Sequence, residues 1–413
     1  MRTILHVDLN NFYASVECML NPKLSGKDVA VCGASEDRHG IVLAKSKEAK
    51  LKGVKTGMTI WEAKKLAPNL IVLTANFPLY LKYSKIVRGI FENYTDLIEP
   101  FGIDESWLDV TASLNILGSP FEIATKIKNE IFEKTKLTVS IGISFNKIFA
   151  KLGSDIAKND EIVEISKNNF KQIVWPRPVE ELLYVGKATK RKLNKLNIFS
   201  IGDLANYDVE ILNKKLGKWG NYIHDFANGK DLTPVRNMMQ IAPIKSIGNS
   251  MTVYKDLRTP QEVKVVLTLL SGSIISRLRD LYVQTYNIIH IHITKSNLES
   301  LSFQKKVEES TLSTVKLTNQ AYNLILENYN FFEPIRAIGI SVSGLNFSFK
   351  QENIFQNKKL EKLELAASSI QKKYGNTKFK RAILLIDKKL SELDIKEEHI
   401  IHPESFFRGN TSH

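Results

Sequence analysis

The chain has 413 residues, of which 43% are hydrophobic and 25% charged, with a formal net charge of +14. This length suggests roughly two to four globular domains, and no apolar run approaches the ~20 residues that a membrane span needs. The positive charge favours a polyanionic partner, either nucleic acid or an anionic membrane surface, although a generally lysine-rich proteome would produce the same excess.

The first predicted strand runs into the segment HVDLNNFYASVE, residues 6–17. Asp8 ends an apolar strand-like run, and a helix that opens with two aromatic residues begins just behind it. The N-terminus lacks a signal-peptide pattern, and of the two cysteines, Cys18 and Cys32, the second lies within another strand-like run. We therefore expect a cytoplasmic protein with reduced, buried thiols and, without a Cys/His cluster, no zinc site.

Two adjacent acids, Asp104 and Glu105, lie in the apolar segment FGIDESWLDV, residues 101–110. Neighbouring side chains of a strand point to opposite faces, so these acids converge only at a strand end or a tight turn. If Asp8 joins them, three carboxylates about 4 Å apart repel by roughly 4 kcal/mol per pair. Such a cluster would suit Mg²⁺ or Mn²⁺, and two ions would suit phosphoryl transfer. The alternative is that Asp8 caps the next helix and the acidic pair forms a solvated turn.

Strand and helix patterns alternate up to residue 166 and indicate an α/β or α+β layer architecture. A helix is predicted over residues 121–136, a strand over 137–144 and a second helix over 146–158, capped by Asn146 or Ser144. The apolar positions of the first helix are Ile123, Ile127, Ile131 and Phe132. The second helix carries three lysines on one face, which suit a triphosphate but are equally typical of a solvated amphipathic helix: Lys147, Lys151 and Lys158.

The remaining chain divides at two proline-containing segments, near residues 174–181 and around 233–243. Short helices are predicted between them. Residues 243–345 then follow the order βαββαβ, with helices over about 260–282 and 314–329. This order predicts a ferredoxin-like, four-stranded antiparallel sheet with two helices on one face and an open face for binding. Past residue 351 we expect an apolar, lysine-rich helix and loosely ordered sequence.

Four stretches together resemble the Y-family DNA polymerases of the DinB (DNA polymerase IV) type. They occur in the family's order and spacing over about residues 1–350, and they read HVDLNNFYASVE, GIDESWLDV, SIGISFNKIFAKLGSDIAK and KSIG. The resemblance implies a template-directed DNA polymerase of low fidelity that bypasses lesions and lacks a proofreading exonuclease.

The fold implied is an α+β, multidomain right hand with palm, fingers, helical thumb and a ferredoxin-like little finger. The implied ranges are 1–10 and 78–166 for the palm, 11–77 for the fingers, 167–233 for the thumb, 234–242 for a linker, 243–350 for the little finger and 351–413 for a tail.

The implied metal-binding acids are Asp8, Asp104 and Glu105, joined by the backbone carbonyl of Leu9. They would hold two Mg²⁺ ions, for which Mn²⁺ can substitute, and Glu105 would serve the ion nearest the primer end. Asn10 stands where many members carry a further Asp. A palm-type nucleotide cyclase and a catalytically silent DNA-binding scaffold remain alternatives. The domains after residue 170 and the net charge oppose the cyclase, and the intact acids oppose the scaffold.

The resemblance also implies a nucleotide site. Tyr13 matches the steric gate, a ring under the sugar that collides with a 2′-hydroxyl, and Phe12 matches its aromatic neighbour. Lys158 matches the lysine that contacts the triphosphate. Lys47 and Lys50 stand where the family commonly has Tyr and Arg, so the bidentate fork of Arg is lost.

The implied DNA contacts lie in the thumb and the little finger. The thumb segment LLYVGKATKRKL resembles a helix-hairpin-helix, although Tyr184 occupies the place of its first glycine. The residues assigned to DNA are Gly186, Lys187, Lys190, Lys245 and Ser246.

The segment QENIF, residues 351–355, resembles the peptide that docks polymerases onto the sliding clamp. Its characteristic residues are Gln351, Ile354 and Phe355, although the last two could instead pack onto the preceding strand. The expected partners are thus primer–template DNA, a dNTP and the clamp, with no membrane, and the protein is expected to act as a monomer.

Overall fold

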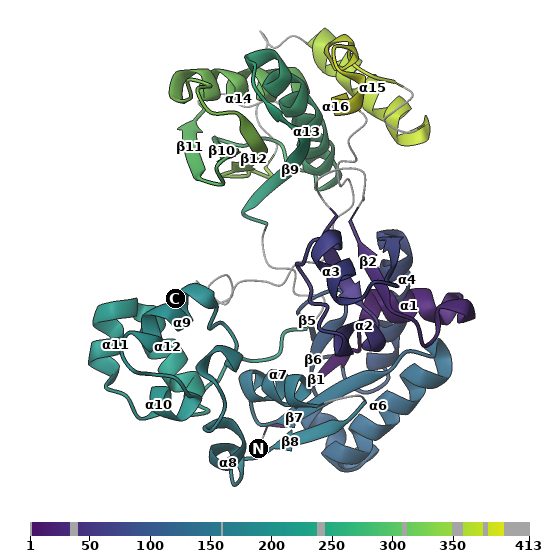
Figure 1. Cartoon of the computed structure of the whole chain (residues 1–413), viewed down its shortest axis with the longest axis vertical. Helices are drawn as coiled ribbons and strands as arrows, with labels where there is room; N and C mark the ends of the chain where they lie inside the picture. The colour runs from purple at the N-terminus through teal and green to yellow at the C-terminus, as the bar shows by residue number, and fades with distance from the viewer. Residues whose placement is uncertain are drawn as a thin grey trace. The chain divides into compact units, whose positions relative to one another are not determined.

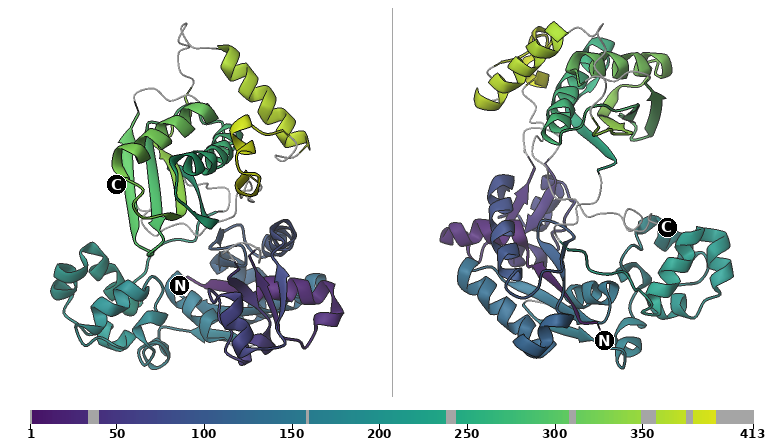
Figure 2. Two further views of the ribbon diagram at one scale, coloured as in Figure 1. Left: turned by 45° about the horizontal axis from the view of Figure 1, so that its top comes forward. Right: turned by 180° about the vertical axis from the view of Figure 1, so that it is seen from behind.

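A computed structural model describes residues 2–33, 40–157, 160–237, 244–307, 312–348, 358–374 and 379–391 (Figures 1 and 2). The chain divides into two compact units, which follow one another at residues 242 and 243. Each unit has its own sheet and hydrophobic core. Within the described ranges, no helix is long and apolar enough to cross a membrane.

The first unit is built around a five-stranded sheet in the order β5-β6-β1-β7-β8. Its strands are β1 (Ile4–Leu9), β5 (Ile98–Pro100), β6 (Glu105–Asp109), β7 (Val139–Ser144) and β8 (Ile162–Ile165). Strand β1 lies in the middle and pairs antiparallel with both β6 and β7. Because its residues alternate between the faces, Leu5, Val7 and Leu9 point to one side and His6 and Asp8 to the other.

Three helices bury the face that carries Leu5, Val7 and Leu9. They are α1 (Phe12–Leu20), α4 (Phe77–Phe91) and α6 (Pro120–Thr135). Helix α6 confirms the helix predicted over 121–136 and buries its three isoleucines. Phe132, the fourth apolar position of this helix, is 49% exposed because it lies beside the buried stripe.

Helix α7 (Lys147–Ile156) covers the opposite face, and two glycines let it approach the sheet closely. A Cβ at Gly142 of β7 would collide with the backbone of Ala150 and Ser154, and one at Gly153 would lie 3.0 Å from the Cα of Gly142. Of the two predicted caps, Asn146 accepts from the amide of Phe149 at 2.7 Å. Ser144 instead donates to the carbonyl of Ile165.

Lys147 has a structural role, which corrects its predicted place on a triphosphate-binding face. Its ammonium lies 2.7 Å from both carboxylate oxygens of Glu99, and Glu99 also accepts from the backbone amide of Arg236 at 3.0 Å. The side chain packs over the ring of Trp107, whose Nε1 donates to the carbonyl of Lys147. These contacts tie the segment around Arg236 to the sheet.

The first unit also contains a small sheet in the order β3-β2-β4 and a helical segment. The small sheet comprises β2 (Val29–Cys32), β3 (Val42–Lys45) and β4 (Ile71–Thr74), with helices α2 (Lys47–Leu51) and α3 (Ile60–Leu66) beside it. The helical segment consists of α8 (Phe170–Val174), α9 (Lys187–Asn194), α10 (Ile201–Ala205), α11 (Val209–Leu216) and α12 (Lys218–Ala227). Its short helices agree with the sequence pattern, which showed no strand alternation there.

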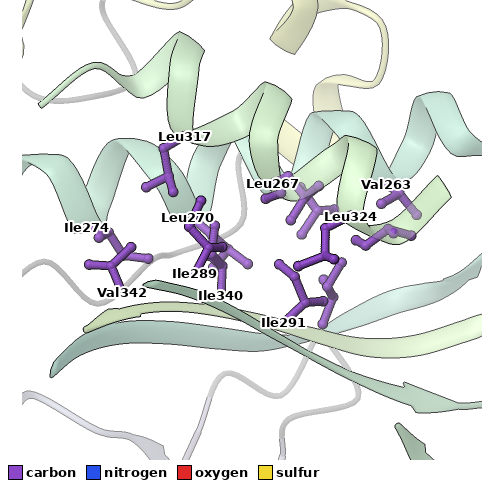
Figure 3. Close-up of a cluster of buried hydrophobic side chains, with 14 of the residues drawn as sticks. Val263, Leu267, Leu270, Ile274, Ile289, Ile291, Leu317, Leu324, Ile340 and Val342 are labelled. Atoms are coloured by element: carbon purple, nitrogen blue, oxygen red, sulfur yellow. The ribbon is translucent and has the colours of Figure 1, made fainter. Parts of the chain in front are cut away.

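The second unit confirms the predicted βαββαβ order. Its strands are β9 (Ser246–Leu257), β10 (Ile288–Lys295), β11 (Ser300–Lys306) and β12 (Ile335–Ser343), in the antiparallel order β11-β10-β12-β9. Helices α13 (Pro260–Asp280) and α14 (Thr314–Asn328) lie on one face of the sheet. Figure 3 shows their apolar side chains meeting those of β10 and β12.

A tail follows this sheet and includes α15 (Lys358–Tyr374) and α16 (Lys388–Ser391). Glu364 of α15 is only 3% exposed, because its carboxylate accepts from Ser313 Oγ and from the amide of Thr314 at the start of α14. Arg279 and Arg381 also pair with this carboxylate. The tail helix is therefore joined to the second unit through a buried, hydrogen-bonded acid.

The contact between α7 and β7 generates a prediction. Gly142→Ala should destabilise the first unit by about 3 kcal/mol, because the added methyl group meets backbone that cannot move away. All four tryptophans lie in the first unit, so the midpoint of urea unfolding followed by tryptophan fluorescence measures this unit alone.

Gly89→Ala provides the matched control. Gly89 lies in α4, and a Cβ there meets no atom within 4 Å, so the substitution should stabilise the unit by about 0.5 kcal/mol. Equal effects of the two substitutions would contradict the close approach of α7.

Candidate active site

The register of β1 and β6 brings the predicted acids together. Asp8 lies directly opposite Glu105 across the antiparallel pair, so the two carboxylates share one face of the sheet. Strand β6 begins at Glu105, and Asp104 therefore precedes the pleat rather than alternating within it. The amide of Leu9 donates to the carbonyl of Asp104 at 3.0 Å, which joins the two chain segments at this strand end.

Lys151 of α7 extends its ammonium into this group of acids. Nζ lies 2.8 Å from Oε2 of Glu105, 3.3 Å from Oδ2 of Asp8 and 2.8 Å from Oδ1 of Asp155. The lysine side chain is 12% exposed. Burial disfavours its charge, but the surrounding carboxylates outweigh that effect and raise the pKa of Lys151 well above its usual value. The ammonium is thus charged at every physiological pH.

His6 lies behind Glu105 and is fully buried. Its Nδ1 is 2.7 Å from Ser154 Oγ, and its Nε2 is 3.5 Å from Oε2 of Glu105. Burial, and then the charge of Lys151, lower the pKa of His6 well below its usual value. His6 is therefore neutral, and the positive charge beside Glu105 comes from Lys151.

The carboxyl groups resist ionisation in this setting. Burial raises the pKa of Asp8 to about 6 against the opposing effect of Lys151, and Glu105 adds to the rise. Burial and the nearby Asp8 raise the pKa of Asp104 to about 6, and burial raises that of Glu105 as well. A group of acids with these shifts gains stability from any additional cation that binds to it.

The donor set fits a hard divalent cation. In the described part of the chain, no three His, Cys, Asp or Glu side chains already surround one point as metal ligands, and the acids pair with the ammonium of Lys151 instead. Two other oxygens of these acids lie close to Gly102, since a Cβ there would be 3.2 Å from Asp104 Oδ1 and 3.6 Å from Glu105 Oε1. Oxygen-only donors around a position that already attracts an ammonium suit Mg²⁺ or Mn²⁺.

Tyr13 lies close to these acids. Its ring stacks on Tyr80 with centroids 4.3 Å apart and an interplanar angle of 10°, and Tyr80 donates to Glu17 at 2.7 Å. Burial, and then the carboxylate of Asp104, raise the pKa of Tyr13 to about 12. Phe12 is buried in the core beneath. Tyr13 therefore presents a fixed, neutral ring next to the acids.

The predicted triphosphate lysines are only partly described. Lys47 and Lys50 are both exposed on α2. Lys45, which the sequence did not single out, donates to Thr56, and burial together with Lys50 lowers its pKa. Lys158 lies outside the described residues.

The candidate DNA contacts of the first unit lie at the start of α9. Gly186 is its N-cap residue, and Lys187 is exposed. Lys190 pairs with Glu180, so its charge is partly neutralised. Tyr184 adopts a left-handed φ of 71°, which explains why a glycine suits this position, and its ring contacts those of Trp219 and Phe226.

The candidate DNA contacts of the second unit are Lys245 and Ser246, which are exposed at the start of β9. The residues of the clamp-like peptide, Gln351, Ile354 and Phe355, lie outside the described residues.

Sequence reasoning missed two members of the site, His6 and Asp155. His6 stands two residues before Asp8 on a strand, a spacing that places both on one face. Asp155 stands four residues after Lys151 on a helix, a spacing at which oppositely charged side chains pair. Both signals were present in the sequence.

The sequence matches one family of proteins in two places. The sequence model of the impB/mucB/samB family matches residues 7–155, and that of its C-terminal domain matches residues 244–358. The chain is 44% identical to a DNA polymerase IV of Acetivibrio thermocellus, over 95% of this chain and 100% of that protein. It is 37% identical to a DNA polymerase IV of Clostridium kluyveri, over 93% and 98% of the two chains.

Solved structures resemble the fold. A Y-family DNA polymerase chimera of Dbh and Dpo4 has a TM-score of 0.73 and 29% identity, and the match covers 84% of this chain and 100% of the chimera. A Dbh ternary complex has a TM-score of 0.57 and 29% identity, with 83% and 98% covered. The relatives found by sequence and the structures found by fold are thus both DNA polymerases.

The raised pKa of Asp104 predicts how stability depends on pH. Because the folded protein binds this proton more tightly than the unfolded chain, the resulting stabilisation is complete below pH ~4 and is lost as the pH rises through 6. Well above pH 6 the ionised carboxylate costs the folded protein about 3 kcal/mol. Asp104→Asn should therefore raise the unfolding temperature in EDTA at pH 8 and leave it unchanged at pH 4.

Mg²⁺ provides the complementary measurement on the same two proteins. It should raise the unfolding temperature of the wild type at pH 8 more than that of the variant, because the variant has lost a charged ligand. If the unfolding temperatures of wild type and Asp104→Asn in EDTA differ by the same amount at pH 4 and pH 8, ionisation of Asp104 is not the cause of the difference in stability.

Proposed function

Since this chain belongs to the impB/mucB/samB family and is a translesion DNA polymerase of the Y-family, we propose that its catalytic residues are Asp8, Asp104 and Glu105. The observation that carries this proposal is the pairing of Asp8 with Glu105 at the strand end next to Asp104. The enzyme adds nucleotides to a primer 3′-OH as a template directs.

The three acids and the backbone carbonyl of Leu9 would hold two Mg²⁺ ions, for which Mn²⁺ can substitute. When bound, such ions activate the primer hydroxyl and neutralise charge on the triphosphate. The residues of the chain prepare this chemistry. Asp8 and Asp104 would supply oxygens to the ions and Glu105 would serve the ion nearest the primer end, while the pairing of β1 with β6 holds Asp8 and Glu105 in register.

Tyr13 would select the sugar of the incoming nucleotide. Its ring is fixed by stacking on Tyr80 and stands beside Asp104, where a 2′-hydroxyl would collide with it. Phe12 supports that ring from the core, and Lys47, Lys50 and Lys158 would bind the triphosphate. Lysines present point charges rather than a bidentate fork, so we expect a looser hold on the phosphates than arginine would give.

We assign the parts of the fold to a polymerase hand. The five-stranded sheet would be the palm (1–10 and 78–166), the small sheet the fingers (11–77), and the short helices the thumb (167–233). A linker (234–242) would lead to the little finger (243–350), and a tail (351–413) would follow.

The net charge of +14 supports binding along the DNA backbone. Gly186, Lys187 and Lys190 would contact phosphates from the thumb, and Lys245 and Ser246 from the little finger. Because such contacts release counterions, affinity should fall steeply with salt.

The sequence supports two further assignments. Residues 351–355 would dock the enzyme onto the sliding clamp through Gln351, Ile354 and Phe355. The enzyme would otherwise act as a monomer in the cytoplasm, where its DNA substrate and its two free thiols, Cys18 and Cys32, are both expected.

Primer extension tests the catalytic assignment. Glu105→Ala should abolish Mg²⁺-dependent addition of dNTPs to a primer on an undamaged template, yet leave primer–template binding within about twofold of wild type. Glu327→Gln, at an exposed ion pair of the second unit, should extend primers normally. Normal extension by Glu105→Ala would refute the assignment, and DNA binding without extension by the wild type would favour the scaffold function.

Sugar selection gives a separate test of the same site. Tyr13→Ala should incorporate ribonucleotides at least ~100-fold more readily relative to deoxyribonucleotides, because the ring no longer meets the 2′-hydroxyl. Tyr13→Phe keeps the ring and should keep the selectivity. The ratio of kcat/KM for dNTP over NTP measures both, and an unchanged ratio in Tyr13→Ala would rule out the gate.

A further inference from the structure

The ammonium of Lys151 stands where the acidic site concentrates its negative charge. It is within 3.3 Å of oxygens on Asp8, Glu105 and Asp155, and Asp104 is close enough for its pKa to respond to it. Three carboxyl groups thus lie around this one cation. In the absence of other cations, this ammonium offsets their mutual repulsion.

The backbone holds Lys151 in this place. Gly142 and Gly153 bring α7 against the sheet, Asn146 caps its start, and Trp107 donates to the carbonyl of Lys147. Ser154, one turn along the helix, donates to the carbonyl of Lys151. Because the backbone of α7 is fixed, the ammonium of Lys151 can move away from the acids only through a change of its side-chain rotamer.

A bound divalent ion would share carboxylates with this ammonium. Oε2 of Glu105 and Oδ2 of Asp8 pair with Lys151, whereas Oε1 of Glu105 and Oδ1 of Asp104 lie close to Gly102. Glu105 can therefore serve both cations, one through each of its two oxygens. The two cations nevertheless repel one another across only a few ångströms of partly buried site, and that repulsion weakens metal binding.

We infer that Lys151 is a resident counter-cation of the acidic site, which stabilises the site without metal and lowers its affinity for divalent ions. The inference rests on the proposed metal-binding role of Asp8, Asp104 and Glu105. It makes Lys151 a positioning residue that sets how much free metal the enzyme needs. Metal then binds as an addition to a folded, charge-compensated site rather than as the event that assembles it.

Lys147 provides a matched comparison on the same helix. It lies one turn before Lys151, and the two lysine side chains are 11% and 12% exposed. Lys147 pairs with Glu99, which is not among the proposed metal ligands. Replacing either lysine removes a buried ion pair, but only Lys151 contacts the metal-binding acids.

The test is a titration with Mn²⁺, in which electron paramagnetic resonance measures the free ion, in the absence of DNA and nucleotide. Lys151→Met should bind the first ion about tenfold more tightly than wild type, because the competing charge is gone. In EDTA the same variant should unfold at a lower temperature than wild type, as followed by tryptophan fluorescence. Lys147→Met should also unfold earlier but bind Mn²⁺ with wild-type affinity.

Two further variants keep the outcome interpretable. Lys151→Arg retains the charge and should bind Mn²⁺ within about twofold of wild type, and Lys151→Gln should repeat the tighter binding if the methionine variant does not fold. Unchanged or weaker binding in the neutral variants would overturn the inference. If Asp104→Asn instead binds Mn²⁺ as well as wild type, the proposed metal site itself is misplaced, whatever the Lys151 variants do.

Discussion

The close approach of α7 to the central sheet is the contact on which the proposed active site depends. Gly142 and Gly153 remove the side chains that would hold helix and sheet apart, and the gap that remains has room for backbone only. This spacing lets a lysine on the helix reach acids on two strands. The acidic face of the sheet is thus shaped by residues that carry no functional group.

Placing these acids together lowers the stability of the folded protein, but it creates a site that can attract cations. Asp8, Asp104 and Glu105 lie partly buried beside one another, at a cost that their raised pKa values express. The ammonium of Lys151 offsets part of this cost. His6 is neutral, so it adds no second positive charge to the site. A polymerase that must release its products and bind fresh nucleotide in each cycle gains from a site that keeps its shape between these events.

Much of this could be read from the sequence, because strands, helices and acidic positions follow local periodicity. The acids of the site, the helix over 147–156 and the βαββαβ unit all have local signatures. The partners of individual charges do not. Lys147 and Lys151 share one face of a helix, yet the strand beneath each differs, so one pairs with Glu99 and the other with the acidic site. The left-handed backbone of Tyr184, a conformation that favours glycine, could likewise not be read from the sequence, because the ring contact with Trp219 is a tertiary one.

Glu364 changes how the end of the chain should be regarded. The match to the family's C-terminal domain stops at residue 358, six residues before a carboxylate that caps α14 and pairs with two arginines. A premature stop codon just after that boundary would leave Arg279 and the first amides of α14 without their buried acid. Such a truncated protein would have a destabilised second unit that is subject to proteolysis, rather than an intact fold that merely lacks a tail.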